Sequence, residues 1–261
     1  MDLEIGTKTA LVLGGGGGLG GAIARALAAE GATVAVASRT KAGAEVTVAD
    51  IVARGGRAAA FAWDQGDLGE MERQVGLIED RLDSVDILVN MTGGPRPTPV
   101  TGVAPEEWTA YFQSMVLPVI ALTDRVLPKM RERGWGRVIT STSSGVIAPI
   151  PNLGLSNALR STLIGWSKTL AAEVGGDGIT SNIVLPGRIA TSRIEFLDAA
   201  RAERENRPVE QVTADSVGSI PVGRYGRAVE YGQTVAFLAS TAASYITGSV
   251  VRVDGGLIAS V

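Results

Sequence analysis

The 261-residue chain contains neither cysteine nor histidine. Without cysteine it can form no disulfide, thiolate nucleophile or thiolate metal site. Without histidine it has no imidazole acid or base, no Ser–His relay and no ordinary zinc site, so no metal is expected. Any catalysis must therefore use Ser, Thr, Tyr, Asp, Glu, Lys or Arg side chains, or a bound cofactor.

The sequence also lacks a strong charge imbalance and any long apolar run. Its net charge is −3 and no basic stripe stands out, so we expect no nucleic-acid partner. The first residues, Met1-Asp-Leu-Glu4, carry no basic region or long apolar stretch, and no segment is long enough to span a bilayer. We therefore expect no secretory signal, no membrane partner and a cytoplasmic location.

Glycine, in contrast, is concentrated in one place. Five consecutive glycines, Gly14 to Gly18, follow the apolar run Thr9–Leu13 and precede the amphipathic stretch Leu19–Leu27. This pattern predicts a buried strand, a turn without side chains and a helix whose free N–H groups can bind a pyrophosphate. The glycines fit several registers of the dinucleotide-binding fingerprint, among them Gly15-x-Gly17-x-x-Gly20 and Gly14-x3-Gly18-x-Gly20. The candidate cofactor residues of this turn are Gly14, Gly16, Gly17, Gly18, Leu19 and Gly20.

Strand-like apolar runs alternate with helical stretches along the whole chain, which predicts an α/β fold: a single doubly wound Rossmann domain with helices on both faces of a parallel sheet. The expected strands are Thr9–Leu13, Thr33–Ala37, Ala58–Trp63, Asp86–Val89, Arg137–Thr140, Thr180–Leu185 and Ser249–Val253. The expected helices are Gly20–Ala29, Ala42–Arg54, Leu68–Arg81, Pro105–Arg131, Asn157–Val174 and Ala228–Ala239. Pro118 and Pro128 predict a kink or an early end in the fourth helix. The charged segment 192–219 predicts a mobile helical insertion over the C-terminal edge of the sheet.

Ligands of such sheets bind beyond the carboxyl ends of the strands, so the residues that follow each strand are candidates. The second strand is followed by Ser38-Arg39-Thr40 rather than by a carboxylate, and an arginine there favours the 2′-phosphate of NADP(H) over NAD(H). Asp64 and Gln65 follow the third strand, where they could accept from an adenine amino group. The fourth strand leads into a turn of small residues suited to lying against a ribose, with Asn90, Thr92 and Gly93.

Several segments, taken together, resemble the short-chain dehydrogenase/reductase superfamily over essentially the whole length. They are Gly14-x3-Gly18-x-Gly20, Asp64, Asn90-x-x-Gly93, Ser143, Pro186-Gly187-x-Ile189-x-Thr191 and Val253-Asp-Gly-Gly256. The resemblance implies a seven-stranded parallel sheet, a nicotinamide cofactor and a homotetramer or homodimer. It also implies that Ile189 and Thr191 hold the carboxamide, next to Pro186 and Gly187, and that Asn90 lies by the adenine-side ribose.

The sequence departs from this family at three of four expected catalytic positions. The family places a Tyr thirteen residues after the serine and a Lys four residues later, where this chain has Ser156 and Arg160. The assistant Asn falls on Met115, so Ser143 alone matches. An aliphatic hydroxyl is a much weaker acid than a phenol, and Arg160 does not release its proton. The candidate catalytic residues are therefore Ser143, Ser156 and Arg160, with Arg160 also a cofactor candidate.

Three interpretations follow from these departures. The first is an NADP(H)-dependent oxidoreductase for a small carbonyl or alcohol substrate, whose proton comes from water, Ser156 or a tyrosine such as Tyr111. The second is a non-redox enzyme on the same fold, and the third is an NADP(H)-binding protein without dehydrogenase activity. Arg96 and Arg188 could join Arg160 around one pocket, which predicts an anionic small-molecule substrate.

Overall fold

The computed structural model describes residues 2–261, which contain one sheet of seven parallel strands. The strand order is β3-β2-β1-β4-β5-β6-β7, and every neighbouring pair is parallel. The strands are β1 (Thr9–Val12), β2 (Thr33–Ser38), β3 (Arg57–Ala62), β4 (Ile87–Met91), β5 (Gly136–Ser141), β6 (Ile179–Pro186) and β7 (Val250–Val253). All seven expected strands are confirmed, with small differences at their ends.

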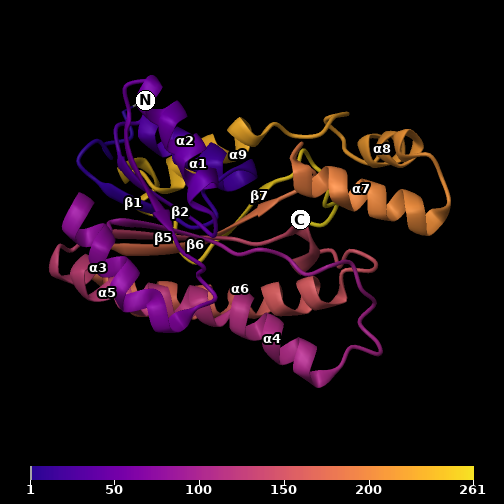
Figure 1. Ribbon diagram of the computed structural model, residues 1–261, viewed down its shortest axis with the longest axis horizontal. Helices are drawn as coiled ribbons and strands as arrows, with labels where there is room; N and C mark the ends of the chain where they lie inside the picture. The colour runs from indigo at the N-terminus through magenta and orange to yellow at the C-terminus, as the bar shows by residue number, and fades with distance from the viewer. Residues whose placement is uncertain (1) are drawn as a thin grey trace.

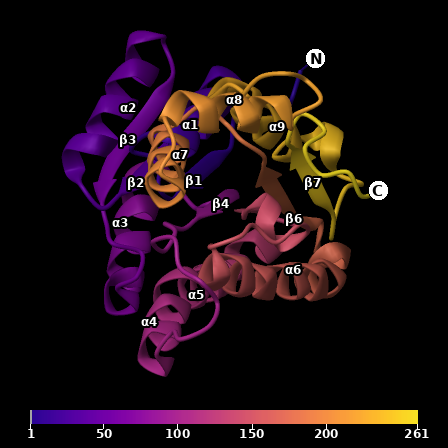
Figure 2. The same ribbon diagram turned by 90° about the vertical axis from the view of Figure 1, so that its right-hand side faces the viewer.

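Helices cover both faces of this sheet (Figures 1 and 2), as the alternation of apolar and helical segments predicts. The fully buried β1 shows why, since Ala10 and Val12 face one apolar core while Leu11 faces another. The first core is closed by α1 (Gly18–Ala29), α2 (Lys41–Ala53) and α9 (Ala228–Leu238). The second is closed by α3 (Met71–Leu82), α5 (Leu117–Glu132) and α6 (Gly154–Val174).

The expected helix Pro105–Arg131 is two helices, α4 (Pro105–Met115) and α5, which meet at Val116. Pro118 lies in the first turn of α5, where its missing N–H costs no hydrogen bond within the helix. Pro128 lies inside α5 without ending it. Met115 is buried at the junction in a third small core with Val116.

The charged segment after β6 forms two helices, α7 (Ser192–Glu205) and α8 (Val209–Gly218). Asn206 separates them in a left-handed conformation with φ of 49°, and Pro208 precedes α8. Figure 1 shows this pair standing beside the layered body of the molecule. Across residues 2–261, no helix combines the length and the apolarity that a bilayer crossing needs.

The strand order reverses at β1, which pairs with β2 on one side and with β4 on the other. Helices that follow β1 and β4 leave on opposite faces of the sheet, so the chain opens a crevice at the carboxyl ends of these two strands. The glycine-rich turn and the turn after β4 both lie at this point.

Candidate active site

The turn between β1 and α1 is closed so tightly that side chains do not fit in it. A Cβ on Gly20 would lie 2.2 Å from the carbonyl oxygen of Gly14, and one on Gly16 would lie 2.6 Å from Ser38 Oγ. Gly18 has a φ of 51°, in the left-handed region that favours glycine. By contrast, a Cβ on Gly17 would meet nothing within 4 Å, so this side of the turn faces open space.

The same turn exposes the amino end of α1 to that open space. Gly17 is the N-cap and offers no side chain to accept from the first N–H groups, and the first turn carries no acidic residue. Uncapped N–H groups with the positive end of the helix dipole form a binding place for an anion. The turn and the helix end therefore fit a dinucleotide pyrophosphate.

The candidates for the adenosine end are placed around the ends of β2, β3 and β4. Arg39 is exposed, and Thr40 Oγ1 accepts from Gly43 N at 3.4 Å, which caps α2. The carboxylate of Asp64 accepts from Gly66 N at 3.0 Å, and Gln65 Nε2 donates to Met91 O at 3.0 Å.

The side chain of Asn90 lies inside the protein. It is fully buried, and Nδ2 donates to Thr123 Oγ1 at 3.2 Å. Its Oδ1 is buried without a hydrogen-bond partner among the described residues. The Asn90 amide points into the interior between β4 and α5, so the expected place beside the adenine-side ribose stays a prediction for the backbone of Asn90 and not for its side chain.

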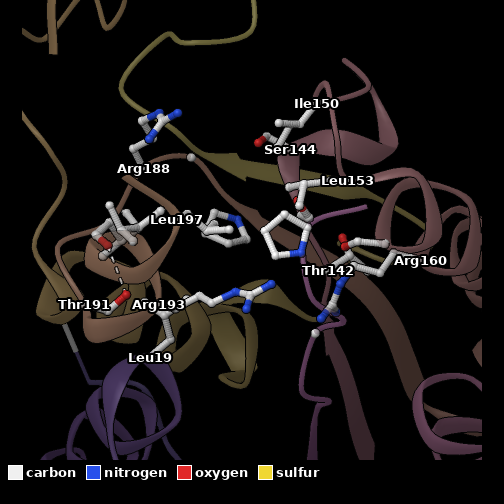
Figure 3. A pocket seen from close by; sticks show the side chains of 18 of the residues that line it. Leu19, Thr142, Ser144, Ile150, Leu153, Arg160, Arg188, Thr191, Arg193 and Leu197 are labelled. Atoms are coloured by element: carbon white, nitrogen blue, oxygen red, sulfur yellow. Dashed lines mark hydrogen bonds between the residues drawn. The ribbon is translucent and has the colours of Figure 1, made fainter. Parts of the chain in front are cut away.

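A cavity of about 640 Å³ opens beyond the carboxyl ends of β4, β5 and β6, between the amino end of α1 and helix α7 (Figure 3). The structure brings most of the expected nicotinamide-end residues to it. The expected residues that line it are Gly18, Leu19, Thr92, Gly93, Ser143, Ser156, Arg160, Pro186, Gly187, Arg188, Ile189 and Thr191. The adenosine-end candidates do not line it. A Cβ on Gly18 would lie 4.0 Å from Thr191 Cγ2, so the loop after β6 passes close to the glycine-rich turn.

Ser143 and Ser156 present hydroxyl groups to this cavity without a base beside them. Ser143 lies two residues after the end of β5 and caps the short 3-10 turn Ser144–Val146, its Oγ accepting from Gly145 N at 3.2 Å. Ser156 lies in the first turn of α6 and is buried. Both are hydrogen-bonding groups that could hold a substrate oxygen.

Arg160, one turn further along α6, is a buried cation held only by neutral acceptors. Its Nη2 donates to Gly93 O at 2.8 Å and Thr92 O at 3.2 Å, and its Nη1 lies 3.5 Å from Ser141 O. Burial, with a smaller contribution from the nearby Arg193 charge, lowers the pKa of Arg160 to about 10. Arg160 is thus still positively charged at neutral pH.

None of the four tyrosines lines the cavity within residues 2–261. Tyr111, the alternative proton donor, packs instead beside Met115 and Val116 in the small third core. Tyr231 is fully buried beneath the site, 2.7 Å from Ser141 Oγ, and donates to Val184 O at 3.1 Å. Burial raises its pKa above the usual value for a phenol. Nor does any Lys, Asp or Glu of the described chain line the cavity, so arginine supplies its only charged groups.

The arginines of the cavity differ from those that the sequence suggests. Arg96 does not line it; this side chain is exposed and pairs with Glu107 at 3.2 Å, so the expected group of Arg96, Arg160 and Arg188 is not formed. Arg188 does line it, but its charge is neutralised by Asp198 at 2.7 Å.

The sequence reasoning missed three further arginines of the cavity, which all come from α7: Arg193, Arg201 and Arg204. The signal that could have found Arg193 is its position two residues after Thr191, in the first turn of the insertion. Figure 3 shows the Arg193 and Arg160 side chains extending into the same part of the cavity.

The fold and the site thus define a doubly wound nucleotide-binding protein with a cavity beside its phosphate-binding turn. A family profile described as enoyl-(acyl carrier protein) reductase matches residues 15–258. The chain belongs to this family, within the short-chain dehydrogenase/reductase superfamily.

Individual relatives agree with this assignment. The chain is 34% identical to the 3-oxoacyl-[acyl-carrier-protein] reductase of Synechocystis sp., over 96% of this chain and 97% of that one. Among solved structures it is similar to L-sorbose reductase of Gluconobacter frateurii in complex with NADPH and L-sorbose, with a TM-score of 0.93, 27% identity and 100% of both chains covered. A protein of Beutenbergia cavernae described as an NAD(P)-dependent gluconate 5-dehydrogenase, with bound NADP, gives a TM-score of 0.90 and 29% identity over 100% of both chains.

Proposed function

We propose that the protein is an NADP(H)-dependent oxidoreductase that interconverts a small carbonyl compound and its alcohol, or reduces a related acceptor, in a non-standard active site. The observation that carries this proposal is the direct opening of the phosphate-binding turn into the cavity: Gly18 and Leu19 line the same cavity as Ser143, Ile189 and Thr191. A dinucleotide bound at the turn would have its other end in this cavity.

The choice of NADP(H) is supported by the chemistry after β2. Arg39 is exposed there and no carboxylate follows the strand, which suits a 2′-phosphate better than a free ribose diol. The solved structures of L-sorbose reductase and of the gluconate 5-dehydrogenase contain NADPH and NADP respectively, which adds support by relationship.

When bound, a reduced nicotinamide would supply the hydride. The protein would supply positioning by the Ser143 and Ser156 hydroxyl groups and a positive charge from Arg160. A guanidinium stabilises the negative charge that develops on a substrate oxygen but does not give up a proton. We therefore propose that Arg160 stabilises charge and that solvent provides the proton.

The all-arginine charge of the cavity favours an anionic substrate. Sugar acids fit this expectation, and the Beutenbergia cavernae relative is described as acting on gluconate. The same set of cavity side chains favours a second candidate function, a protein that binds NADP(H) without dehydrogenase activity. None of the described side chains that line the cavity exchanges a proton near neutral pH, so none could act as the general acid of a carbonyl reduction.

Binding and turnover assays separate these functions. Protein fluorescence would be titrated with NADPH and NADH, and then a panel of ketones, aldehydes and keto acids would be tested by absorbance of the reduced cofactor. We expect NADPH to bind more tightly than NADH, Arg39→Glu to reverse that preference, and at least one carbonyl compound to be reduced. Tight NADPH binding with no turnover above the blank would support the second candidate, and failure to bind either nucleotide would exclude both.

The resemblance to the family also leads us to propose a homodimer or homotetramer. Light scattering tests this directly, and a monomer would contradict it.

A further inference from the structure

Five arginines line the cavity, and only three of them have a carboxylate partner within residues 2–261. Arg188 pairs with Asp198 at 2.7 Å, and Arg201 and Arg204 share Glu205 at 2.8 Å and 3.4 Å. The two that remain are Arg160 and Arg193. Their positive charges are therefore not neutralised by the described part of the protein.

These two arginines come from different elements and meet at Gly94. A Cβ placed on Gly94 would lie 3.0 Å from Arg193 Nη2 and 3.7 Å from Arg160 Nη2. Because both nitrogens lie this close to one point, the two guanidinium groups are neighbours. In Figure 3 the side chains of Arg193, from α7, and Arg160, from α6, extend toward each other. Two like charges at such a distance repel each other unless an anion lies with them.

Neither guanidinium is held there by an opposite charge. Arg160 is 8% exposed and uses the backbone carbonyls of Thr92 and Gly93, while Arg193 Nη2 donates to Pro95 O at 2.9 Å. Carbonyl dipoles orient a guanidinium but leave its net charge uncompensated. Arg193 is otherwise exposed and so is accessible to a ligand from the cavity.

The helix that carries Arg193 is anchored by a buried link between α7 and the loops beside it. Asp198, 3% exposed, accepts from Arg188 Nη1 in the loop after β6 and from Tyr225 Oη at 2.6 Å in the segment before α9. Arg193 lies one to two turns before Asp198 on the same helix. The helix that presents Arg193 is thus anchored at its middle, which preorganises the pair for a ligand.

We propose that Arg160 and Arg193 form a two-arginine clamp for the carboxylate of the substrate. Guanidinium groups match carboxylates with paired, charge-assisted N–H···O bonds, and one carboxylate can accept from both sides. The rest of the cavity supplies apolar lining for the carbon chain from Leu19, Ile150, Leu153, Ile194 and Leu197. A carboxylate held by this clamp makes the substrate a small oxo or hydroxy acid. This inference rests on the proposed function, which places the cofactor in the same cavity.

Calorimetric titrations of matched probes test the clamp. Pyruvate, 4-oxopentanoate and 2-oxoglutarate would be compared with their methyl esters and with inorganic phosphate, on the free protein and on the NADPH-saturated protein. We expect at least one acid to bind tenfold or more tightly than its ester. Arg193→Gln should remove most of that difference, and Arg193→Lys should restore part of it. The affinity for the ester and for NADPH should not change.

Arg201→Gln is the matched control, because Arg201 belongs to the same helix and lines the same cavity but has Glu205 as a partner. It should preserve the preference for the acid. The inference is wrong if no acid is preferred over its ester, if phosphate binds more tightly than every acid, or if Arg201→Gln has the effect of Arg193→Gln. It is also wrong if Arg193→Gln weakens NADPH and not the acid, since Arg193 would then serve the cofactor. A failure of NADPH binding in the wild-type protein would overturn the proposed function alone, because the acid and ester titrations of the free protein still decide the clamp.

Discussion

Replacing Arg160 by methionine should stabilise the free protein while it removes the charge that the site needs. The cation is disfavoured in the fold, because burial lowers the pKa of Arg160 well below the usual value for a guanidinium, to about 10. A group whose folded pKa is lower than its unfolded pKa carries this cost at every pH below the folded value, and so at neutral pH. At 1.36 kcal/mol for each pKa unit, the cost is roughly 3 kcal/mol.

The hydrogen bonds of Arg160 act in the opposite direction. The two shorter ones go to Gly93 O and Thr92 O, and a bond of this kind contributes about 1 kcal/mol net. Thr92 and Gly93 line the cavity, so water can reach their carbonyls after the substitution. Methionine is long, flexible and apolar and can fill the stem of the arginine. We therefore expect the free energy of unfolding to rise by about 1 kcal/mol.

Urea denaturation of the ligand-free protein measures this change as a shift of the midpoint at constant slope. Arg188→Met is the matched comparison, since Arg188 is also a cavity arginine but has the buried Asp198 as its partner. Breaking that pair leaves an uncompensated buried carboxylate and should destabilise by roughly 3 kcal/mol. A loss of 2 kcal/mol or more in Arg160→Met would refute the reasoning, because Arg160 would then contribute more to packing and hydrogen bonding than its buried charge costs.

Two further predictions concern turnover and the cofactor site. If the proposed reduction occurs, kcat/KM should be nearly constant from pH 6 to pH 9, because within the described residues no Lys, Tyr, Asp or Glu side chain lines the cavity. A steady change of kcat/KM across pH 7 to 9 would instead indicate that a phenol, an ammonium or a carboxyl group takes part in the reaction. Gly20→Ala should lower both thermal stability and NADPH affinity, because its methyl group would meet Gly14 O at 2.2 Å. Gly17→Ala should leave thermal stability unchanged, because its methyl group would meet no protein atom within 4 Å. Equal losses of stability in a thermal melt of the two variants would contradict this account of the turn.

The sequence predicts the sheet well because its signals are local and repeated. The fully buried β1 and the alternation of cores around Ala10 and Leu11 follow from a continuous apolar run bounded by glycine. The break at Val116 is anticipated by Pro118, although a proline alone does not tell a kink from a new helix.

The charged groups of the cavity are less predictable, since each depends on a partner that is distant in the sequence. Arg96 and Arg188 follow strands and both lie where ligands are expected, yet Glu107 takes the first and Asp198 neutralises the second. Arg193 belongs to an insertion whose path over the sheet edge no local pattern specifies. Asn90 follows the same logic: its spacing is that of a cofactor residue, but its amide is turned inward to Thr123.

The cavity as a whole gives a physical meaning to the non-standard active site that we propose, with Ser156 and Arg160 at the positions of the expected tyrosine and lysine. A phenol–ammonium pair serves a reaction in which an alkoxide must be protonated as it forms. In the site that we propose, Ser156 takes the place of the phenol and Arg160 takes the place of the ammonium, and Arg193 adds a second positive charge beside Arg160. Such a site is poor at donating protons and well suited to holding negative charge in place. Selection of the substrate by its carboxylate and stabilisation of the developing anion therefore depend on the same guanidinium, so variants of Arg160 should alter both affinity and turnover, whereas variants of Arg193 should alter mainly affinity.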